Sequence, residues 1–203
     1  MPGHQWTVIP RPHLHEFINS LPLKYSTELG ERGSRISVGQ QQRIGIARAV
    51  ATNPKLIVAD EPVSALDVSI QSQVLNLFAE LREQRGLALL FITHDLAVVN
   101  FIADRVAVMY LGRIVEIANR DVLLREPHHP YSQALRAAVP KPGAGKRQSR
   151  KALVGSSPDP TSPPRGCPFH PRCPKAQTIC KEIEPVLESV GGNVNHQAAC
   201  HFK

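Results

Sequence analysis

The sequence has no long apolar run and few aromatic residues. Phe, Trp and Tyr make up 5% of its 203 residues, whereas apolar residues make up 42%, so we expect a core of mainly aliphatic side chains. The longest purely apolar stretch, residues 87–92, is far shorter than the roughly 20 residues of a membrane-spanning helix. Residues 1–11 lack the basic-then-apolar order of a secretory signal. We therefore expect a protein that is soluble and cytosolic, or bound peripherally to a membrane.

The formal charge of +7 is unevenly distributed, because the whole basic excess falls after residue 110. Basic segments bind nucleic acid or anionic lipid in some proteins. Here the charges flank Pro, Gly and Ser rather than the aromatic residues that stack on bases. This composition favours a solvated linker over residues 140–166, and we expect no nucleic-acid partner. A metal- or nucleic-acid-binding module over residues 140–203 is the alternative.

Helical and strand patterns alternate from about residue 37. Apolar residues at helical spacing predict three helices, over residues 40–52, 68–85 and 96–102. Short apolar runs predict four strands, over residues 56–59, 87–93, 106–110 and 113–117. The first two strands have the continuous apolar character of buried parallel strands. This alternation is typical of an α/β domain with a mainly parallel sheet, in which ligands bind beyond the carboxyl ends of the strands.

Ionisable side chains follow both predicted parallel strands. Asp60 and Glu61 end the first strand, where Asp60 suits Mg²⁺ bound through water and Glu61 suits the activation of an attacking water. His94 follows the second strand, where an imidazole suits a hydrogen bond to a phosphate or to water. Taken alone, the acidic pair equally suits a surface turn, and a histidine here is more often structural.

Two short segments precede predicted helices. In the first, Ser37, Gly39 and Gln40 form a turn whose helix N-terminus suits a phosphate, because its backbone N–H groups and the helix dipole attract anions. In the second, residues 64–67 lead into the next helix with Asp67 at the capping position. A plain helix cap is the alternative in both places.

In this order and spacing, the segments resemble the motifs of ABC transporter ATP-binding proteins. Residues 36–43 are similar to the ABC signature, and residues 56–62 are similar to Walker B with its catalytic glutamate. Residues 64–67 look like the D-loop, and residues 93–95 look like the switch histidine. The resemblance implies the C-terminal part of a P-loop NTPase domain of the α/β class.

Further along, the resemblance is to the ATPases of oligopeptide and dipeptide importers. It is carried by residues 65–71, 94–99, 109–112 and 128–135 and continues into the cysteine-containing end. Three regions are thus expected. Residues 1–36 are irregular and exporter-like from about residue 14, residues 37–118 are the ABC ATPase domain, and residues 119–203 are the importer-type C-terminal extension, which contains the linker.

The resemblance implies an ATP-hydrolysing subunit, peripheral at the cytoplasmic face of the membrane, that powers peptide uptake. Its cofactors would be ATP and Mg²⁺. Its partners would be a second ABC ATPase subunit, identical or paralogous, transmembrane permease subunits and, indirectly, a peptide-binding protein. By motif, the resemblance assigns catalysis to Glu61 and His94, and it assigns contact with ATP held by the partner subunit to Ser37, Gly39 and Gln40. It assigns contact with Mg²⁺ to Asp60 and places Asp67 in the D-loop.

The sequence also departs from the family. It contains no Gly-x-x-x-x-Gly-Lys-Ser/Thr motif, the loop that cradles the nucleotide phosphates in P-loop NTPases, so we expect the isolated chain to be inactive. Val38 stands where the signature usually has glycine; a β-branched residue disfavours positive φ and adds bulk near the phosphate. The alternatives are an inactive truncated or chimeric fragment and a piece of an ABC exporter ATPase.

All four cysteines, Cys167, Cys173, Cys180 and Cys200, lie near the end of the chain. Disulfides are uncommon in the cytosol, and clustered cysteines there more often bind a metal. The sequence has no Cys-x-x-Cys pair of the zinc-finger kind. The resemblance to importer ATPases implies a [4Fe–4S] cluster on these cysteines, and zinc or free thiols are the alternatives. Three histidines are nearby substitute ligands: His170, His196 and His201.

Overall fold

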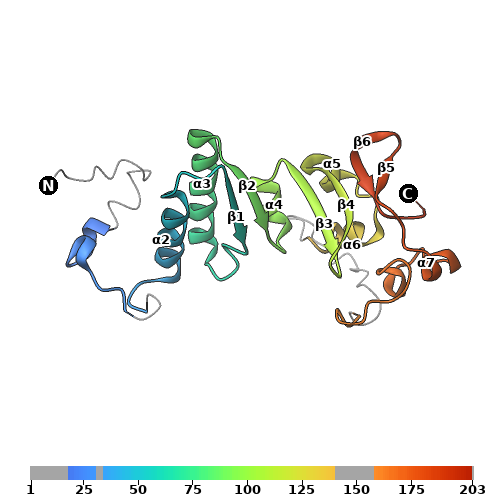
Figure 1. Ribbon diagram of the computed structural model, residues 1–203, viewed down its shortest axis with the longest axis horizontal. Helices are drawn as coiled ribbons and strands as arrows, with labels where there is room; N and C mark the ends of the chain where they lie inside the picture. The colour runs from blue at the N-terminus through green and yellow to red at the C-terminus, as the bar shows by residue number, and fades with distance from the viewer. Residues whose placement is uncertain (1–17, 31–33, 140–157, 203) are drawn as a thin grey trace, which may run out of the picture. The chain divides into compact units, whose positions relative to one another are not determined.

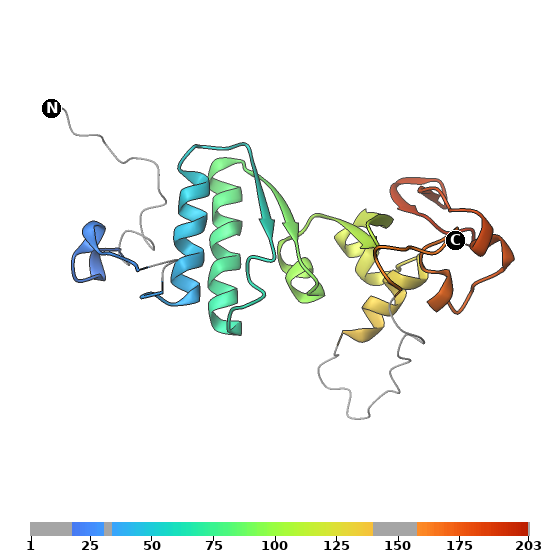
Figure 2. The same cartoon turned by 60° about the horizontal axis from the view of Figure 1, so that its bottom comes forward.

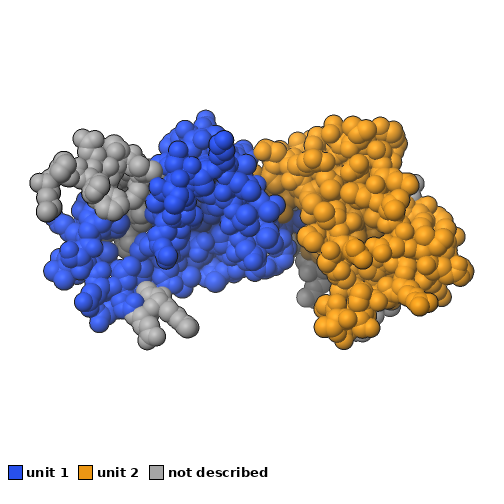
Figure 3. All heavy atoms as spheres, in the orientation of Figure 1, with its two compact units in different colours: residues 1–98 blue, residues 99–203 orange. Residues whose placement is uncertain are grey.

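The computed structural model describes residues 18–30, 34–139 and 158–202 (Figure 1). The start of the irregular N-terminal region and most of the expected linker lie outside these ranges. The chain divides into two compact units, residues 1–98 and residues 99–203 (Figure 3). None of the helices in the described ranges combines the length and hydropathy of a membrane span.

Within its described residues, the first unit contains a two-stranded parallel sheet with helices beside it. Its elements are η1 (Lys24–Ser26), α2 (Val38–Val50), β1 (Leu56–Asp60), α3 (Val68–Arg85), β2 (Ala88–Ile92) and α4 (Leu96–Ile102), the last of which continues into the second unit. Gly86 ends α3 with a left-handed φ of 62°, a conformation that glycine adopts without steric cost. The helices and strands predicted here are confirmed to within two residues at each end.

Helices α2 and α3 lie side by side next to the parallel strand pair (Figures 1 and 2). The register pairs Leu56 with Ala88 and Asp60 with Ile92, so both strands end at the same edge. Alternate β1 side chains, Ile57 and Ala59, are buried. They belong to an aliphatic core with residues of α2, α3 and α4, including Val50, Val74, Leu81 and Val98.

The opposite face of this sheet is open within the described residues, so the prediction of two fully buried strands is wrong for that face. Val58 and Leu90 are 58% and 53% exposed. The apolar run predicted burial on both faces, as in α/β domains whose sheet is covered on each side. Only one face of this sheet is packed into the core.

The second unit is built on a four-stranded antiparallel sheet in the order β3-β4-β6-β5. Its elements are β3 (Arg105–Tyr110), β4 (Arg113–Asn119), α5 (Arg120–Arg125), α6 (Pro130–Ala138), η3 (His170–Arg172), α7 (Thr178–Glu182), β5 (Glu188–Val190) and β6 (Asn193–Ala198). The α/β class is confirmed, but among the described strands only β1 and β2 pair in parallel. The pair β5–β6 was not predicted, because its residues have no clear apolar alternation.

Candidate functional site

The carboxyl ends of β1 and β2 bring Glu61 and His94 together. The Nδ1 atom of His94 lies 2.9 Å from Oε1 of Glu61. The backbone N–H of Glu61 donates to the carbonyl oxygen of Ile92 at 2.9 Å, which extends the strand pairing by one residue. Glu61 adopts a positive φ of 44°, a conformation that is costly for a non-glycine residue and that is frequent at functional sites.

Each member of this pair favours the charged form of the other. The hydrogen bond from His94 lowers the pKa of Glu61, and the hydrogen bond to Glu61 raises the pKa of His94. Both side chains are largely solvent-exposed, at 47% and 74% for Glu61 and His94. The pair is therefore accessible to a ligand at the end of the sheet.

The other two acidic site residues lie in the same stretch of chain. Asp60 is exposed at the last position of β1. Asp67 occupies the N-cap position of α3, and its backbone carbonyl accepts from Gln71 N–H. Its side chain makes no capping hydrogen bond, so the simple capping alternative does not account for an aspartate here.

The signature-like segment forms the N-terminus of α2. Ser37 and Gln40 build a capping box, in which Ser37 Oγ accepts from Gln40 N–H at 3.3 Å and Gln40 Oε1 accepts from Ser37 N–H at 2.9 Å. Within the described residues, the N–H groups of Val38 and Gly39 have no acceptor. The helix start therefore retains two donors for an anion.

Val38 does not carry the strain that its sequence position predicts. It is the first residue of α2, and it is not among the residues with positive φ. Its side chain is 52% exposed, so its bulk is directed at least partly to solvent. The prediction that valine is conformationally unfavourable here is wrong, because the position is helical.

At Gly39 the backbone of α2 lies close to the side chain of Ile70 in α3. A Cβ atom at this position would lie 2.5 Å from Cγ2 of Ile70. Arg43 and Gln73, about one turn further along each helix, are joined by a side-chain hydrogen bond. The signature-like helix and the helix after Asp67 are thus held in close contact. Ile70 was not predicted as part of the site, since its partner lies 31 positions away.

The four cysteines meet in the second unit, where all of them line one cavity. No disulfide joins them. The Sγ atom of Cys200 accepts a hydrogen bond from the backbone N–H of Phe202 at 3.4 Å. The backbone N–H groups of Phe169 and Lys175 act to lower the pKa of the Cys167 and Cys173 thiols. Burial nevertheless raises the pKa of the Cys167 and Cys173 thiols, and the neighbouring cysteines contribute in the same direction. Among the described residues, no three His, Cys, Asp or Glu side chains are grouped to hold a single metal ion.

Histidines also line this cavity. His129, His170 and His201 are among its lining residues. His196, a predicted substitute ligand, does not line this cavity and instead donates a hydrogen bond to the Glu116 carboxylate. It lies in β6 with Nε2 2.7 Å from Oε1 of Glu116.

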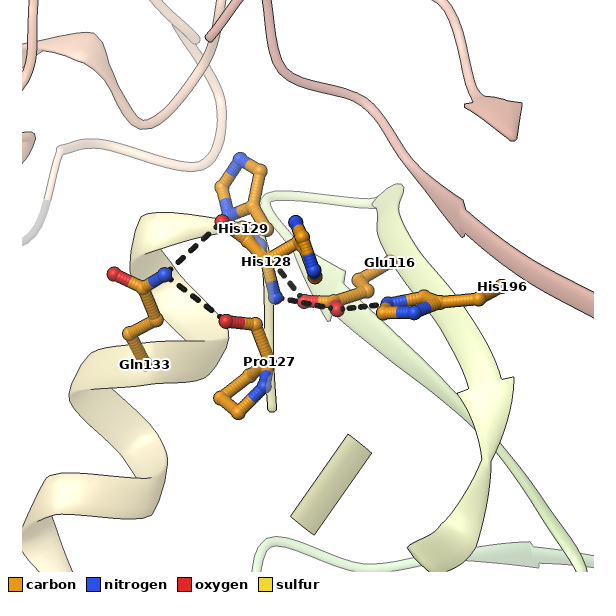
Figure 4. A network of polar contacts seen from close by, with 6 residues as sticks. All are labelled: Glu116, Pro127, His128, His129, Gln133 and His196. Atoms are coloured by element: carbon orange, nitrogen blue, oxygen red, sulfur yellow. Dashed lines mark hydrogen bonds and ion pairs between the residues drawn. The ribbon is translucent and has the colours of Figure 1, made fainter. Parts of the chain in front are cut away.

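Glu116 is a buried carboxylate that sequence reasoning did not single out (Figure 4). It is 0% exposed and accepts three hydrogen bonds. Besides that from His196, it accepts from the backbone N–H groups of His128 at 2.8 Å and His129 at 2.9 Å. It therefore joins β4, β6 and the segment that leads into α6. The partner in β6 lies 80 positions away, which no local pattern indicates.

Comparison with known proteins connects these two units to one family. Residues 8–64 match the family described as ABC transporter, and residues 115–180 match the family described as oligopeptide/dipeptide transporter, C-terminal region. The chain is 53% identical over 176 residues to the oligopeptide transport ATP-binding protein AppF of Bacillus subtilis, which covers 85% of this chain and 53% of AppF. It is 52% identical over 166 residues to the oligopeptide transport ATP-binding protein OppF of Salmonella typhimurium, which covers 81% of this chain and 49% of OppF.

The chain belongs to the ABC transporter ATP-binding family.

As a member of this family, the chain spans about half the length of the curated relatives that it matches. The resemblance inferred from the signature, Walker B, D-loop and switch-histidine segments is confirmed at the level of the family. The roles of the individual residues, the region boundaries and the exporter-like character of residues 14–36 stay predictions.

Proposed function

We propose that this chain is the C-terminal part of the ATP-hydrolysing subunit of a peptide importer. The observation that carries the proposal is the 2.9 Å contact between Glu61 and His94 at the ends of two paired parallel strands. Glu61 accepts the proton of the attacking water, and His94 holds the Glu61 carboxylate and contacts the γ-phosphate. Asp60 would hold Mg²⁺, and this ion would neutralise phosphate charge.

The start of α2 serves an ATP molecule held by another subunit. The free N–H groups of Val38 and Gly39 and the positive end of the α2 dipole bind the γ-phosphate. The Ser37 and Gln40 side chains, which form the capping box at this helix start, would contact the same nucleotide. Asp67 is the last residue of the D-loop, at the start of α3.

The proposed partners follow from these residue roles. A second ABC ATP-binding subunit supplies the other half of each ATP site, and membrane-embedded permease subunits change conformation when the two ATP-binding subunits close. A peptide-binding protein delivers the solute to the permease. We place the chain at the cytoplasmic face of the membrane, bound peripherally.

The test is Mg-ATP hydrolysis by the purified chain, alone and mixed with a fragment of a related ABC protein that carries the phosphate-binding loop but stops before its signature. We expect no turnover by the chain alone and measurable turnover by the mixture. Glu61→Gln should lower this turnover by about 100-fold or more, since it removes the general base. Glu80→Gln, an exposed acid on α3, is the matched control and should leave turnover unchanged.

Three outcomes would count against the proposal. Turnover by the chain alone that Glu61→Gln abolishes would mean that some other loop of the chain binds the phosphates. Unchanged turnover by the Glu61→Gln mixture would remove Glu61 from the reaction. A mixture that binds neither ATP nor the added fragment would favour the alternative of an inactive fragment.

We also infer that the four cysteines hold an iron–sulfur cluster. All four thiols line one cavity, and the sulfur of Cys200 already accepts a backbone N–H bond, a feature that stabilises cluster-bound thiolates. In a four-iron cluster each cysteine binds a different iron, so the sulfurs stand further apart than on one zinc ion.

The cluster would join segments that are far apart in sequence. Its bonds to Cys167, Cys173, Cys180 and Cys200 would link the loop before η3, α7 and the end of the chain, a stabilising role suited to a small region with little apolar core. Anaerobic reconstitution with ferrous iron and sulfide, followed by iron and sulfide analysis, tests this. We expect about four irons per chain, and loss of the cluster in Cys180→Ser. Zinc retention without sulfide, or no bound metal, would contradict it.

A further inference from the structure

His129 lines the cysteine cavity with its ring held in one orientation. It is the N-cap residue of α6, and its Nδ1 atom accepts the backbone N–H of Tyr131 at 3.1 Å. The backbone N–H of His129 itself donates to the buried Glu116 carboxylate at 2.9 Å. The ring is 1% exposed and packs against Phe169, with ring centroids 5.8 Å apart.

This capping bond determines the protonation state of the ring. A nitrogen that accepts a hydrogen bond carries no proton, so His129 is a neutral imidazole with its proton on Nε2. No described residue accepts a hydrogen bond from that Nε2–H. The donor left over belongs to a side chain that lines the cysteine cavity.

The other two histidines of the cavity are arranged differently. His170 donates from Nδ1 to the carbonyl oxygen of Cys167 at 3.0 Å, and His201 donates from Nε2 to the carbonyl oxygen of Ile183 at 3.0 Å. Each of these two rings donates its N–H to a backbone carbonyl oxygen. Among the three, His129 is the one whose backbone contact leaves an N–H for a ligand.

We propose that His129 donates a hydrogen bond from Nε2 to a sulfur of a thiolate-bound iron–sulfur cluster in this cavity. The proposal rests on the cluster inferred above. Cysteine thiolates and sulfides carry negative charge, which increases when the cluster is reduced, so a neutral N–H donor beside them stabilises the reduced form. His129 is thus a positioning and tuning residue, which links the capping of α6 to the cluster.

The test compares two kinds of replacement of His129, which separate its capping role from its donor role. His129→Asn and His129→Ser both keep an oxygen that caps α6 well, but neither carries the Nε2–H donor. His129→Gln keeps an N–H donor of similar reach and loses the cap. His128→Asn is the control, because His128 is adjacent and does not line the cavity. Each protein is reconstituted anaerobically with ferrous iron and sulfide, and its iron content, visible absorbance and midpoint potential are measured.

We expect all variants to bind the cluster, with a lower midpoint potential in His129→Asn and His129→Ser than in the wild type. His129→Gln should lie near the wild type, and His128→Asn should match it. Iron loss to a chelator should be several-fold faster for His129→Asn and His129→Ser, whose shorter side chains place no donor at the position of Nε2. If all the cluster-containing proteins had equal midpoint potentials and equal rates of iron loss, the proposed role of His129 would be overturned, whereas the cluster proposal would stand. A wild-type chain that binds no iron and sulfide would overturn the cluster proposal and this one together.

Discussion

At the scale of single residues, Glu116 and His129 are buried ionisable groups whose roles depend on each other. Glu116 accepts three hydrogen bonds while fully buried, and one of them comes from the backbone of His129. A buried charge is tolerated only when its hydrogen-bonding capacity is met. The polar segment around α6 is thus as much a part of the fold of the second unit as its apolar core.

Glu116→Gln should destabilise the chain by about 3 kcal/mol. The amide would present an NH₂ group to a backbone N–H, so at least one buried donor would lose its acceptor. Urea denaturation measures the change. Glu126→Gln, an exposed acid ten positions along the chain, is the control and should change the unfolding free energy by less than about 0.5 kcal/mol. Equal effects of the two substitutions on the unfolding free energy would contradict the stabilising role of the three hydrogen bonds to Glu116.

The stability of the chain should also fall as the pH drops below neutrality. Burial lowers the pKa of His129 from 6.5 to about 4, and the Glu116 charge opposes this shift. Between these values the unfolded chain binds a proton that the folded chain does not, so stability decreases as the pH falls from 6.5 to 4 and levels off below. The full loss is about 3 kcal/mol.

Urea denaturation at intervals between pH 7.5 and 4.5 measures this dependence. His129→Asn should show a flatter dependence over the same window, because it removes the group that titrates. The same slope in both proteins would mean that other groups cause the acid sensitivity.

At the scale of elements, α2 and α3 pack closely against each other at one glycine, Gly39. The ends of both helices follow local rules, since a capping box begins α2 and a left-handed glycine ends α3. Their close packing depends on Gly39, which faces Ile70. Gly39 therefore has a packing role beside the phosphate contact that the signature predicts.

Alanine substitutions at the two glycines of α2 distinguish the effect of packing from the effect of helix propensity on stability. Gly39→Ala should cost about 1–2 kcal/mol, because the new methyl group collides with the stiff, β-branched Ile70 and this outweighs the gain in helix propensity. Gly45→Ala should stabilise by about 0.5–1 kcal/mol, since Gly45 is exposed with nothing within 4 Å of an added Cβ. Unfolding free energies measure both. A stabilising Gly39→Ala substitution would show that α2 and α3 are not in close contact there.

At the scale of the whole molecule, the described chain leaves one apolar face of the β1–β2 sheet open. Val58 and Leu90 are cross-strand partners on that face, and both are more than half exposed. Exposed apolar faces of this kind promote association with other proteins or with further copies of the chain. The chain should therefore self-associate when it is studied alone.

The double substitution Val58→Glu and Leu90→Lys should reduce this self-association. The new side chains pair across the strands with opposite charge, and their positions are solvent-exposed, so the unfolding free energy should change by less than about 1 kcal/mol. Size-exclusion chromatography with light scattering measures the association. Ile57→Lys, on the packed face at 8% exposure, should instead unfold the chain. Comparable destabilisation by both would mean that the Val58 face is also packed.

The sequence by itself determined the local elements of the first unit and the family of the chain. Helix periodicity, capping residues and the terminal Gly86 act within a few positions, so α2, α3, β1 and β2 were predictable. The meeting of Glu61 and His94 was also implied, because parallel strands end at a common edge. The tertiary structure alone decided the open face of the β1–β2 sheet, the contact of Gly39 with Ile70, the burial of Glu116 and the place of His129 beside the cysteines. Each of these depends on packing between residues far apart in the chain, and hydrogen-bond and packing partners at such separations leave no periodic trace in the sequence.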